Sequence, residues 1–281
     1  MNLNTYLDIN NSFEKTVKYR LTDRGFYSEV CCLLGAANYC MQKRLRLTID
    51  DEGFSGFRWK DFYEDALPKA ENFGAGDLNE ITVRESHKYN RRLNRFRIPV
   101  WNRYERCFQS IFSSYAAFAD ILCRSRFTAS FSSKPYLAVQ LRRGDKVGGY
   151  LSNGVLKIES KLSPISKYTK ILRKYEHISN DVFVLTDDFS AFRELQNAAP
   201  EFTFSTYCQP DEAGYDNNSF HQLNAQEKRG KLMRLIKSVE ICGKSSFFIG
   251  PFQSNPSKFV VLTQGTRSRS VSTDSCRRWL P

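Results

Sequence analysis

The segment PYLAVQLRRGDKV, Pro135–Val147, joins an apolar run to a charged cluster. Tyr136–Leu141 is mostly apolar, and two arginines, a glycine, an aspartate and a lysine follow it. The apolar run predicts a buried β-strand, and the charged residues predict the loop at its carboxyl end. Ligands of open α/β sheets bind at this end of the strands. The segment therefore predicts an α/β fold with a ligand site after this strand.

The neighbouring residues Arg142 and Arg143 suit a phosphate ligand. Each planar guanidinium can donate two parallel hydrogen bonds to phosphate oxygens. Gly144 lets the backbone turn sharply and approach a ligand closely. A surface loop with a solvated ion-pair cluster is an equally good interpretation of this segment by itself.

The composition is that of a soluble globular protein. The 281 residues are 41% hydrophobic and 26% charged, which allows one large domain or two smaller ones. The sequence contains no run of ~20 apolar residues and no N-terminal apolar signal. We therefore expect no transmembrane segment and a cytoplasmic location. Eight cysteines without a CxxC pair favour reduced, buried thiols over a zinc site.

The net charge of +12 favours an anionic partner. Basic residues gather in Arg84–Arg106 and again near the C-terminus. Ordinary solvated surface is the alternative interpretation for any single basic cluster. The charge does not lead us to expect a nucleic-acid partner.

Strand and helix patterns alternate along the second half of the chain. We expect strands at residues 182–185, 201–207 and 246–250, and helices at residues 163–177, 190–199, 226–245 and 255–265. Ser163 and Ser190 are the expected N-caps of the first two helices. The alternation predicts a parallel, doubly wound sheet. In the first half we expect helices at residues 25–41 and 99–123, with a strand at residues 45–49.

Two later segments repeat the pattern of an apolar run followed by polar residues. They are DVFVLTDD, Asp181–Asp188, and SSFFIGPFQSNPSKFV, Ser245–Val260. With the first segment they resemble, in order, motifs of a superfamily that includes the α1,6- and nodulation-factor fucosyltransferases and, more distantly, the protein O-fucosyltransferases. The family motifs read HxRRxDK, TDD and FSSN or FSSQ, and this chain has QLRRGDK, LTDD and FQSN.

The resemblance implies a GT-B fold, in which two Rossmann-like domains face a cleft. We expect an acceptor-side domain at residues 1–130 and a nucleotide-sugar-binding domain at residues 131–281. The implied activity is an inverting, metal-independent glycosyl transfer from a nucleotide sugar to a glycan hydroxyl. No cofactor is expected besides the donor itself. A non-catalytic glycan- or polyanion-binding protein on the same scaffold is the alternative.

The resemblance assigns Arg142 to the β-phosphate of the donor, as a clamp for the departing diphosphate. It makes Arg143 largely structural, with Asp187 or Asp188 holding it. Adjacent carboxylates after a strand also suit Mg²⁺ or Mn²⁺, which is the competing interpretation of these two aspartates. They lack DxD spacing, which favours the arginine-pairing role.

Ser254 and Asn255 stand between an expected strand and an expected helix. Free N–H groups at the start of a helix form an anion site, and the resemblance places Ser254 on the β-phosphate. Simple N-capping by Ser254 or Asn255 is the alternative, and the two roles are compatible. Gly25 lies in RGFYSEV, which is similar to the family's glycine-rich opening turn, and is expected to bind the donor and its phosphates as well.

The catalytic base is expected to be Glu159. The family has a glutamate soon after DKVG and before an HPIxxY segment, and this chain reaches ESKLSPISKY only after an insertion, GYLSNGVLK. Glu159 would accept the proton of the attacking acceptor hydroxyl. An exposed loop glutamate is an equally weighted interpretation. Asp145 is expected to support the loop.

Two departures from the family motifs concern the nucleotide base. Gln140 replaces the histidine that helps to hold guanine, and Ser238 replaces the aspartate that binds the guanine edge. Loss of that carboxylate leaves guanine recognition unexplained. The donor is therefore GDP-fucose by resemblance, with a UDP-sugar such as UDP-xylose as the alternative.

Overall fold

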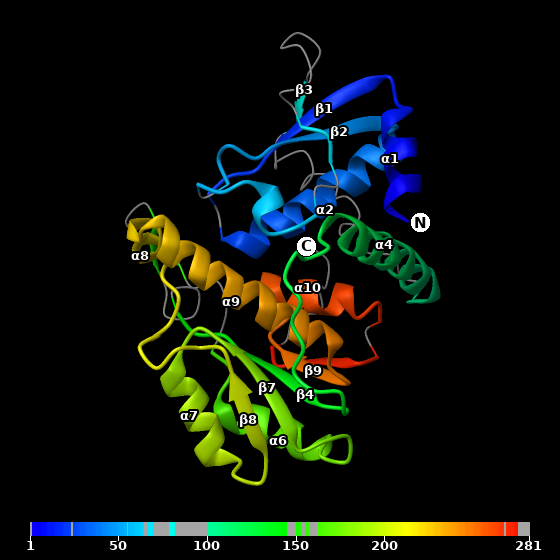
Figure 1. The fold of residues 1–281 in the computed structure, drawn as a ribbon. Coiled ribbons are helices and arrows are strands. Elements are labelled where there is room, and N and C mark those ends of the chain that lie inside the picture. Colours follow the sequence, from blue (N-terminus) through cyan, green and yellow to red (C-terminus); the bar gives the residue numbers. More distant parts are fainter. Residues whose placement is uncertain are drawn as a thin grey trace. The chain divides into compact units, whose positions relative to one another are not determined.

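The computed structural model describes residues 2–23, 25–54, 56–64, 67–69, 79–81, 101–144, 150–152, 155–157, 162–266 and 268–274 (Figure 1). The chain divides into two compact units, an N-terminal unit up to Arg126 and a C-terminal unit from Phe127. Each unit contains its own parallel β-sheet. The α/β class predicted from the sequence is thus confirmed.

The N-terminal unit is built on three parallel strands in the order β2–β1–β3. Their bounds are β1 (Lys15–Arg20), β2 (Leu45–Asp50) and β3 (Asn79–Ile81). Parallel neighbours need a crossover connection, and α2 (Phe26–Lys43) supplies it between β1 and β2. Helix α4 (Trp101–Leu122) packs against α2, and α1 (Leu3–Asn11) contacts β2 and α4. A short 3₁₀ helix, η1, spans Trp59–Asp61.

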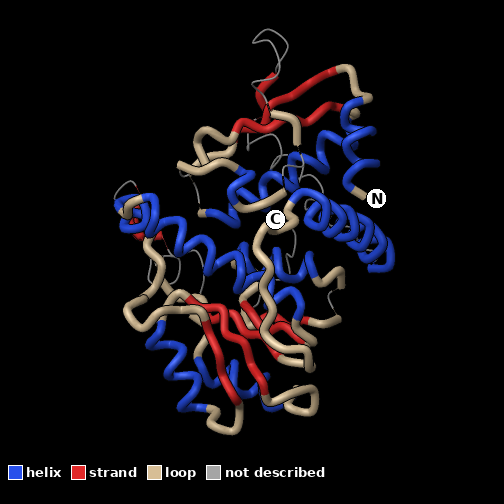
Figure 2. The backbone as a smooth tube through the Cα atoms, viewed as in Figure 1, coloured by secondary structure: helices blue, strands red, loops and turns tan. Residues whose placement is uncertain are grey.

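The C-terminal unit is built on a parallel sheet, whose strands Figure 2 draws in red. Its five strands have the order β10–β9–β4–β7–β8. Their bounds are β4 (Leu137–Leu141), β7 (Asp181–Thr186), β8 (Thr203–Thr206), β9 (Phe247–Gly250) and β10 (Ser270–Ser272). The chain starts at the central strand β4 and moves outward through β7 and β8. It then returns to the other side of β4 for β9 and β10. The strand order therefore reverses between β4 and β9, as in the Rossmann fold.

Helices cover both faces of this five-stranded sheet (Figure 1). They are α6 (Ile165–Lys174), α7 (Phe189–Ala198), α9 (Ala225–Lys244) and α10 (Asn255–Thr263), while the short helix α8 (Asn217–Gln222) directly precedes α9 in the chain. Side chains alternate across a strand, so Leu137, Val139 and Leu141 of β4 pack in one core with α6 and α7. Helix α9 contacts β4 and β7, and α10 packs against α9. The helices thus bury both faces of a parallel sheet, as such sheets require.

Three features differ from the sequence-based expectations. Helix α1 and strand β1 occupy the first twenty residues, for which no element was predicted. Asp188, not Ser190, is the N-cap of α7. Helix α6 starts after Pro164, and the hydroxyl of Ser163 donates to the backbone oxygen of Thr273 instead of capping the helix.

Two short strands lie in the segment after the first motif. Strands β5 (Tyr150–Ser152) and β6 (Val155–Lys157) pair antiparallel. They lie within GYLSNGVLK, the stretch that counts as an insertion relative to the family motif. Across the described ranges, no helix has both the length and the apolar character needed to span a membrane.

Candidate functional site

The loops after β4 and β9 leave the sheet next to each other, where the strand order reverses. In open α/β sheets this switch point is where ligands bind, because the connections on its two sides diverge to opposite faces. Arg142, Arg143 and Gly144 follow β4, and a short turn leads from β9 into α10. The first and third sequence motifs therefore meet at one edge of the sheet.

A chain of hydrogen bonds connects these two loops. The guanidinium of Arg142 donates from Nη1 to Ser254 Oγ at 3.2 Å. The side-chain amide of Gln140 donates from Nε2 to the same oxygen at 3.0 Å. On its other side, Gln140 Oε1 accepts a hydrogen bond from the hydroxyl of Ser257. The structure thus brings together three predicted residues: Gln140 of β4, Arg142 directly after β4, and Ser254 at the N-cap of α10.

Ser254 stands at the N-cap position of α10 but does not cap it with its side chain. An N-cap serine ordinarily accepts a hydrogen bond from an amide of the first helical turn. Here its oxygen faces Gln140 and Arg142 instead. The capping alternative for Ser254 is therefore wrong. The dipole of the helix favours an anion at this end, and Asn255 is its first residue.

Asp187 holds the loop after β4 in place. Its Oδ1 accepts from the backbone amide of Arg143 at 3.0 Å, and its Oδ2 accepts from the amide of Tyr215 at 3.1 Å. Burial raises the pKa of Asp187, although these amides and the charge of Arg142 oppose the shift. The pairing with Arg143 is thus made through the backbone, while the Arg143 guanidinium donates to the backbone oxygen of Arg142 at 3.0 Å.

Asp188 is the N-cap of α7. Its Oδ1 accepts from the amides of Ser190 and Ala191 at 2.8 and 3.1 Å, and from the Ser190 hydroxyl at 2.6 Å. Burial acts to raise the pKa of Asp188, but these hydrogen bonds outweigh it and the pKa lies below its ordinary value. N–H donors therefore occupy oxygens of both carboxylates of the second motif.

Two glycines allow the loop after β4 to pack against the loop before α8. Gly144 and Gly214 have φ angles of +77° and +101°. A Cβ atom on Gly144 would lie 2.3 Å from the backbone oxygen of Tyr215. The two backbones thus touch at positions where only glycine fits. Gly214 and Tyr215 were not identified from the sequence, because they lie in a segment with no motif of its own.

The strand end of β10 supports the turn before α10. Asp274 Oδ2 accepts from the amide of Gln253 at 2.9 Å, and Thr273 donates its amide to the Gly250 oxygen at 3.1 Å. These residues, like Ser257, were missed by sequence reasoning. Ser257 lies on the side of α10 that faces Gln140, so the helix assignment together with the motif would have pointed to it.

The remaining predicted residues lie elsewhere in the chain. Ser238 is buried on α9. Gly25 is the N-cap of α2 in the N-terminal unit, and its phosphate role stays a prediction. Glu159 and Asp145 lie outside the described residues, as does much of the basic cluster from Arg84.

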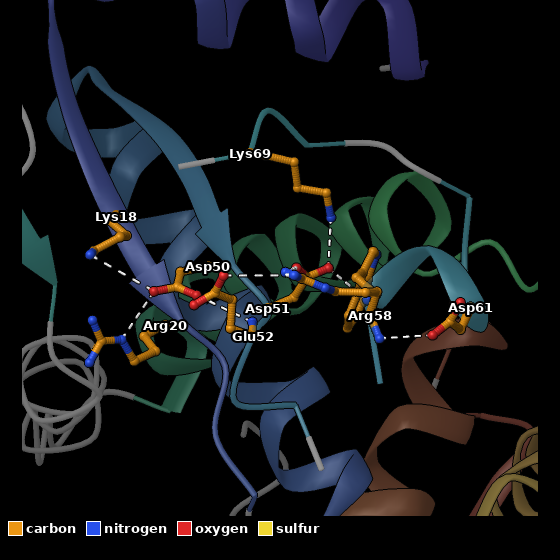
Figure 3. Close-up of polar contacts among 9 residues, drawn as sticks. Lys18, Arg20, Asp50, Asp51, Glu52, Arg58, Asp61 and Lys69 are labelled. Atoms are coloured by element: carbon orange, nitrogen blue, oxygen red, sulfur yellow. Dashed lines mark hydrogen bonds and ion pairs between the residues drawn. The ribbon is translucent and has the colours of Figure 1, made fainter. Parts of the chain in front are cut away.

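The N-terminal unit has its own polar cluster at the carboxyl end of β2 (Figure 3). Asp51, only 2% exposed, accepts hydrogen bonds from Lys69 Nζ at 2.8 Å, Arg58 Nη1 at 3.0 Å and the Trp59 amide at 2.8 Å. Burial acts to raise the pKa of Asp51, but these donors together lower it below its ordinary value. A stable carboxylate with three donors is a structural anchor for the segment after β2 rather than a proton acceptor.

The comparisons with family models and with curated proteins give no match. Solved structures of similar fold exist. POFUT1 in complex with GDP aligns over 92% of this chain and 98% of its own, with 12% identity and a TM-score of 0.47. Arabidopsis thaliana FUT1, as a mutant in complex with GDP, aligns over 96% of this chain and 74% of its own, with 7% identity and a TM-score of 0.49.

POFUT1 in complex with GDP-fucose aligns over 92% of this chain and 97% of its own, with 12% identity and a TM-score of 0.42. The sequence identity is 12% or lower in all three alignments. The function proposed below therefore rests on the site residues of this chain.

Proposed function

We propose that the chain is a fucosyltransferase-like glycosyltransferase of the GT-B class that uses a nucleotide-sugar donor. The observation that carries the proposal is the meeting of the Arg142 guanidinium, Ser254 and the start of α10 where the strand order reverses. Fixed positive charge and aligned N–H dipoles at such a place stabilise the negative charge that develops on a departing diphosphate. The C-terminal unit is the donor side and the N-terminal unit the acceptor side in this proposal.

The transfer proceeds with inversion at the anomeric carbon. The acceptor hydroxyl oxygen forms the new glycosidic bond while the bond to the diphosphate oxygen breaks, and the electron pair of that bond stays with the diphosphate. Arg142 stabilises this leaving group. The hydroxyl proton passes to a base, for which we propose Glu159.

The reaction is proposed to need no metal ion. Asp187 and Asp188 accept hydrogen bonds from backbone amides, and Asp188 also caps α7. An amide presents its hydrogen to the same oxygen lone pairs that a metal ion would use. The engagement of these carboxylates within the protein supports arginine and helix charge, rather than a bound cation, as the counterpart of the diphosphate.

The proposed function allows more than one nucleotide base in the sugar donor. Ser238 offers a hydroxyl where the resemblance calls for a carboxylate, and both ends of the Gln140 amide bind serine side chains. A carboxylate that accepts from the guanine edge is worth about 1–3 kcal/mol of discrimination. We therefore propose a weak preference for guanine, so that a UDP-sugar such as UDP-xylose competes with GDP-fucose as donor.

Calorimetric titration of GDP, UDP and CDP tests the function and the base preference together. We expect GDP and UDP to bind within tenfold of each other, since a carboxylate worth about 1–3 kcal/mol is absent. Tight GDP binding with undetectable UDP binding would show that another residue reads guanine. Thermal unfolding is a second readout, because a ligand at 100 times its Kd stabilises the protein by about 2.7 kcal/mol.

Turnover assays separate an enzyme from a binding protein on the same scaffold. An enzyme hydrolyses or transfers the sugar of the donor whose nucleotide binds. Binding of a nucleotide without any hydrolysis or transfer across a panel of glycan acceptors would contradict catalysis. Failure of every nucleoside diphosphate to bind would contradict the whole proposal.

A further inference from the structure

Three buried polar side chains connect α10 to the guanidinium of Arg142. Ser257 is 0% exposed, Ser254 2% and Gln140 5%. Polar groups this deeply buried need hydrogen-bond partners, since an unsatisfied one costs about 1–3 kcal/mol. The chain of bonds from Ser257 through Gln140 to Ser254 satisfies all three side chains.

The amide of Gln140 has a fixed orientation in this chain. Its oxygen accepts from the Ser257 hydroxyl, and its nitrogen donates to Ser254 Oγ. Both ends of the amide are thereby bound to side chains that follow β9. Both ends of the Gln140 side chain therefore contact neighbours inside the C-terminal unit.

Gly250, the last residue of β9, leaves space for the Ser257 hydroxyl, the first group in this series of hydrogen bonds. A Cβ atom there would lie 2.6 Å from Ser257 Oγ and 2.7 Å from the ring of Phe248. A larger residue would push the Ser257 hydroxyl away from Gln140. The absence of a side chain at Gly250 therefore allows Ser257 to reach Gln140.

The last member of the chain is in contact with Arg142. Ser254 Oγ accepts from Gln140 and also from Arg142 Nη1 at 3.2 Å. An arginine side chain has about 2 kcal/mol of rotamer entropy to lose when a ligand fixes it. A guanidinium that is already held by a buried hydroxyl loses less of that entropy on binding.

We infer that Gln140 is a positioning residue, which holds the Arg142 guanidinium through Ser254 in its ligand-binding orientation and does not read the nucleotide base. The inference rests on the proposed function, because it takes the diphosphate as the ligand of Arg142. Preorganised donors stabilise charge without reorganising during the reaction. Gln140 therefore contributes to diphosphate affinity without touching the diphosphate.

Gln140→Met tests this role, with inorganic pyrophosphate, GDP and UDP as the calorimetric probes. Methionine has a similar length but neither donates nor accepts strongly. We expect all three affinities to fall by roughly tenfold, the upper range of what one intramolecular hydrogen bond contributes, with the ratio of GDP to UDP affinity unchanged. A change in that ratio beyond threefold would show that Gln140 reads the base.

Gln264→Met is the matched control. Gln264 is 9% exposed and caps the opposite end of α10, where its Nε2 donates to Ser245. This variant loses a buried glutamine of the same unit, far along the helix from Ser254. We expect its pyrophosphate affinity to stay within twofold of the wild type, even where its thermal stability falls as much as that of Gln140→Met.

An Arg142→Ala background shows whether Gln140 acts through Arg142. In that background we expect Gln140→Met to cost less than twofold in pyrophosphate affinity, because the group that it positions is gone. A further tenfold loss would overturn the inference, and so would an unchanged affinity of the Gln140→Met single variant. A wild-type protein that binds none of the three probes would overturn the proposed function itself, and this inference with it.

Discussion

Among single residues, Gly144 has the tightest surroundings of the site. It combines a left-handed φ of +77° with a backbone neighbour, Tyr215, where a side chain would stand. Gly265 has a similar φ of +67° but open space around its Cβ position. Substitutions at Gly144 and Gly265 therefore distinguish the cost of backbone strain from the cost of a steric clash.

We expect Gly144→Ala to lower the free energy of unfolding more than Gly265→Ala does. Both variants place alanine in the left-handed region, which costs roughly 1–2 kcal/mol. Gly144→Ala adds overpacking against Tyr215, typically a further 1–3 kcal/mol. Urea unfolding measures both. Equal losses in the two variants would show that the Gly144 loop moves away from Tyr215 at little cost.

Arg142 is the residue on which the proposed chemistry depends. We expect Arg142→Ala to lower the transfer rate by about a hundredfold to a thousandfold, since loss of one preorganised charge donor costs about 2.7–4 kcal/mol. Arg142→Lys should also be poor, because an ammonium does not reproduce the fork of a guanidinium. Arg193→Ala, on the exposed face of α7, is the control. Transfer above half of the wild-type rate in Arg142→Ala would exclude the clamp role.

Among the secondary-structure elements, helix α7 depends on a cap that the sequence pattern misplaced by two residues. DFSAF contains two good N-cap candidates, Asp188 and Ser190, and apolar periodicity does not choose between them. Asp188 is the N-cap in the structure, and its carboxylate also accepts a hydrogen bond from the hydroxyl of Ser190. A single carboxylate therefore fixes the start of this helix.

We expect Asp188→Ala to lower the free energy of unfolding by about 1 kcal/mol at pH 7, as loss of an N-cap typically does. The pKa of Asp188 is lowered in the folded protein, so its stabilisation is present above the unfolded-state pKa of about 3.9. It is lost as the pH falls through the folded-state pKa. The difference between wild type and variant should thus shrink below about pH 4 in urea titrations. A difference that persists at pH 2 would point to a packing effect.

Strong periodicity made most elements of the C-terminal unit predictable. The apolar runs of β4, β7 and β9 and the helices α9 and α10 lie where the sequence indicated them. Helix α1 and strand β1 lack that signal, because polar residues interrupt LNTYLDINN and KTVKYR. Their stability comes from contacts such as Asn10 with Leu47, which no local pattern contains.

The site was predictable only as far as its motifs extend. Arg142 and Ser254 follow apolar strands, so strand ends identified them. Tyr215 acts through a contact between segments that are distant in sequence, and a single sequence holds no record of such contacts. The same holds for Gln140. The resemblance assigns it to the nucleotide base, whereas we infer a positioning role from its hydrogen bonds to Ser254 and Ser257.

Considering the whole molecule, part of the excess positive charge serves the fold. Arg269 donates to the backbone oxygens of Ser245 and Ser246, which joins β10 to the start of β9. Arg234 binds Glu212 at 2.8 Å and thereby ties α9 to the loop before α8. Net charge alone is therefore a weak guide to the partner of this protein.

We expect sugar transfer to continue undiminished in EDTA. The carboxylates of Asp187 and Asp188 accept hydrogen bonds from N–H donors. In the proposed function, Arg142 and the α10 terminus supply the positive charge that a metal ion would bring. The measurement is the transfer rate with and without chelator. Activity that disappears in EDTA and returns with Mn²⁺ would assign a cation to these aspartates.

The order of the strands sets when the site is completed during folding. Arg143 and its partner Asp187 are 44 residues apart in sequence, whereas Arg142 and Ser254 are 112 apart. Closing the longer loop costs about 0.6 kcal/mol more per doubling of length, and domains emerge from the ribosome N-terminus first. We therefore expect the β4–β7 half of the sheet to form before β9 and α10 join it. Under the proposed function, a nascent or truncated chain that lacks α10 should not bind the donor, even with Arg142 already in a formed strand-end loop.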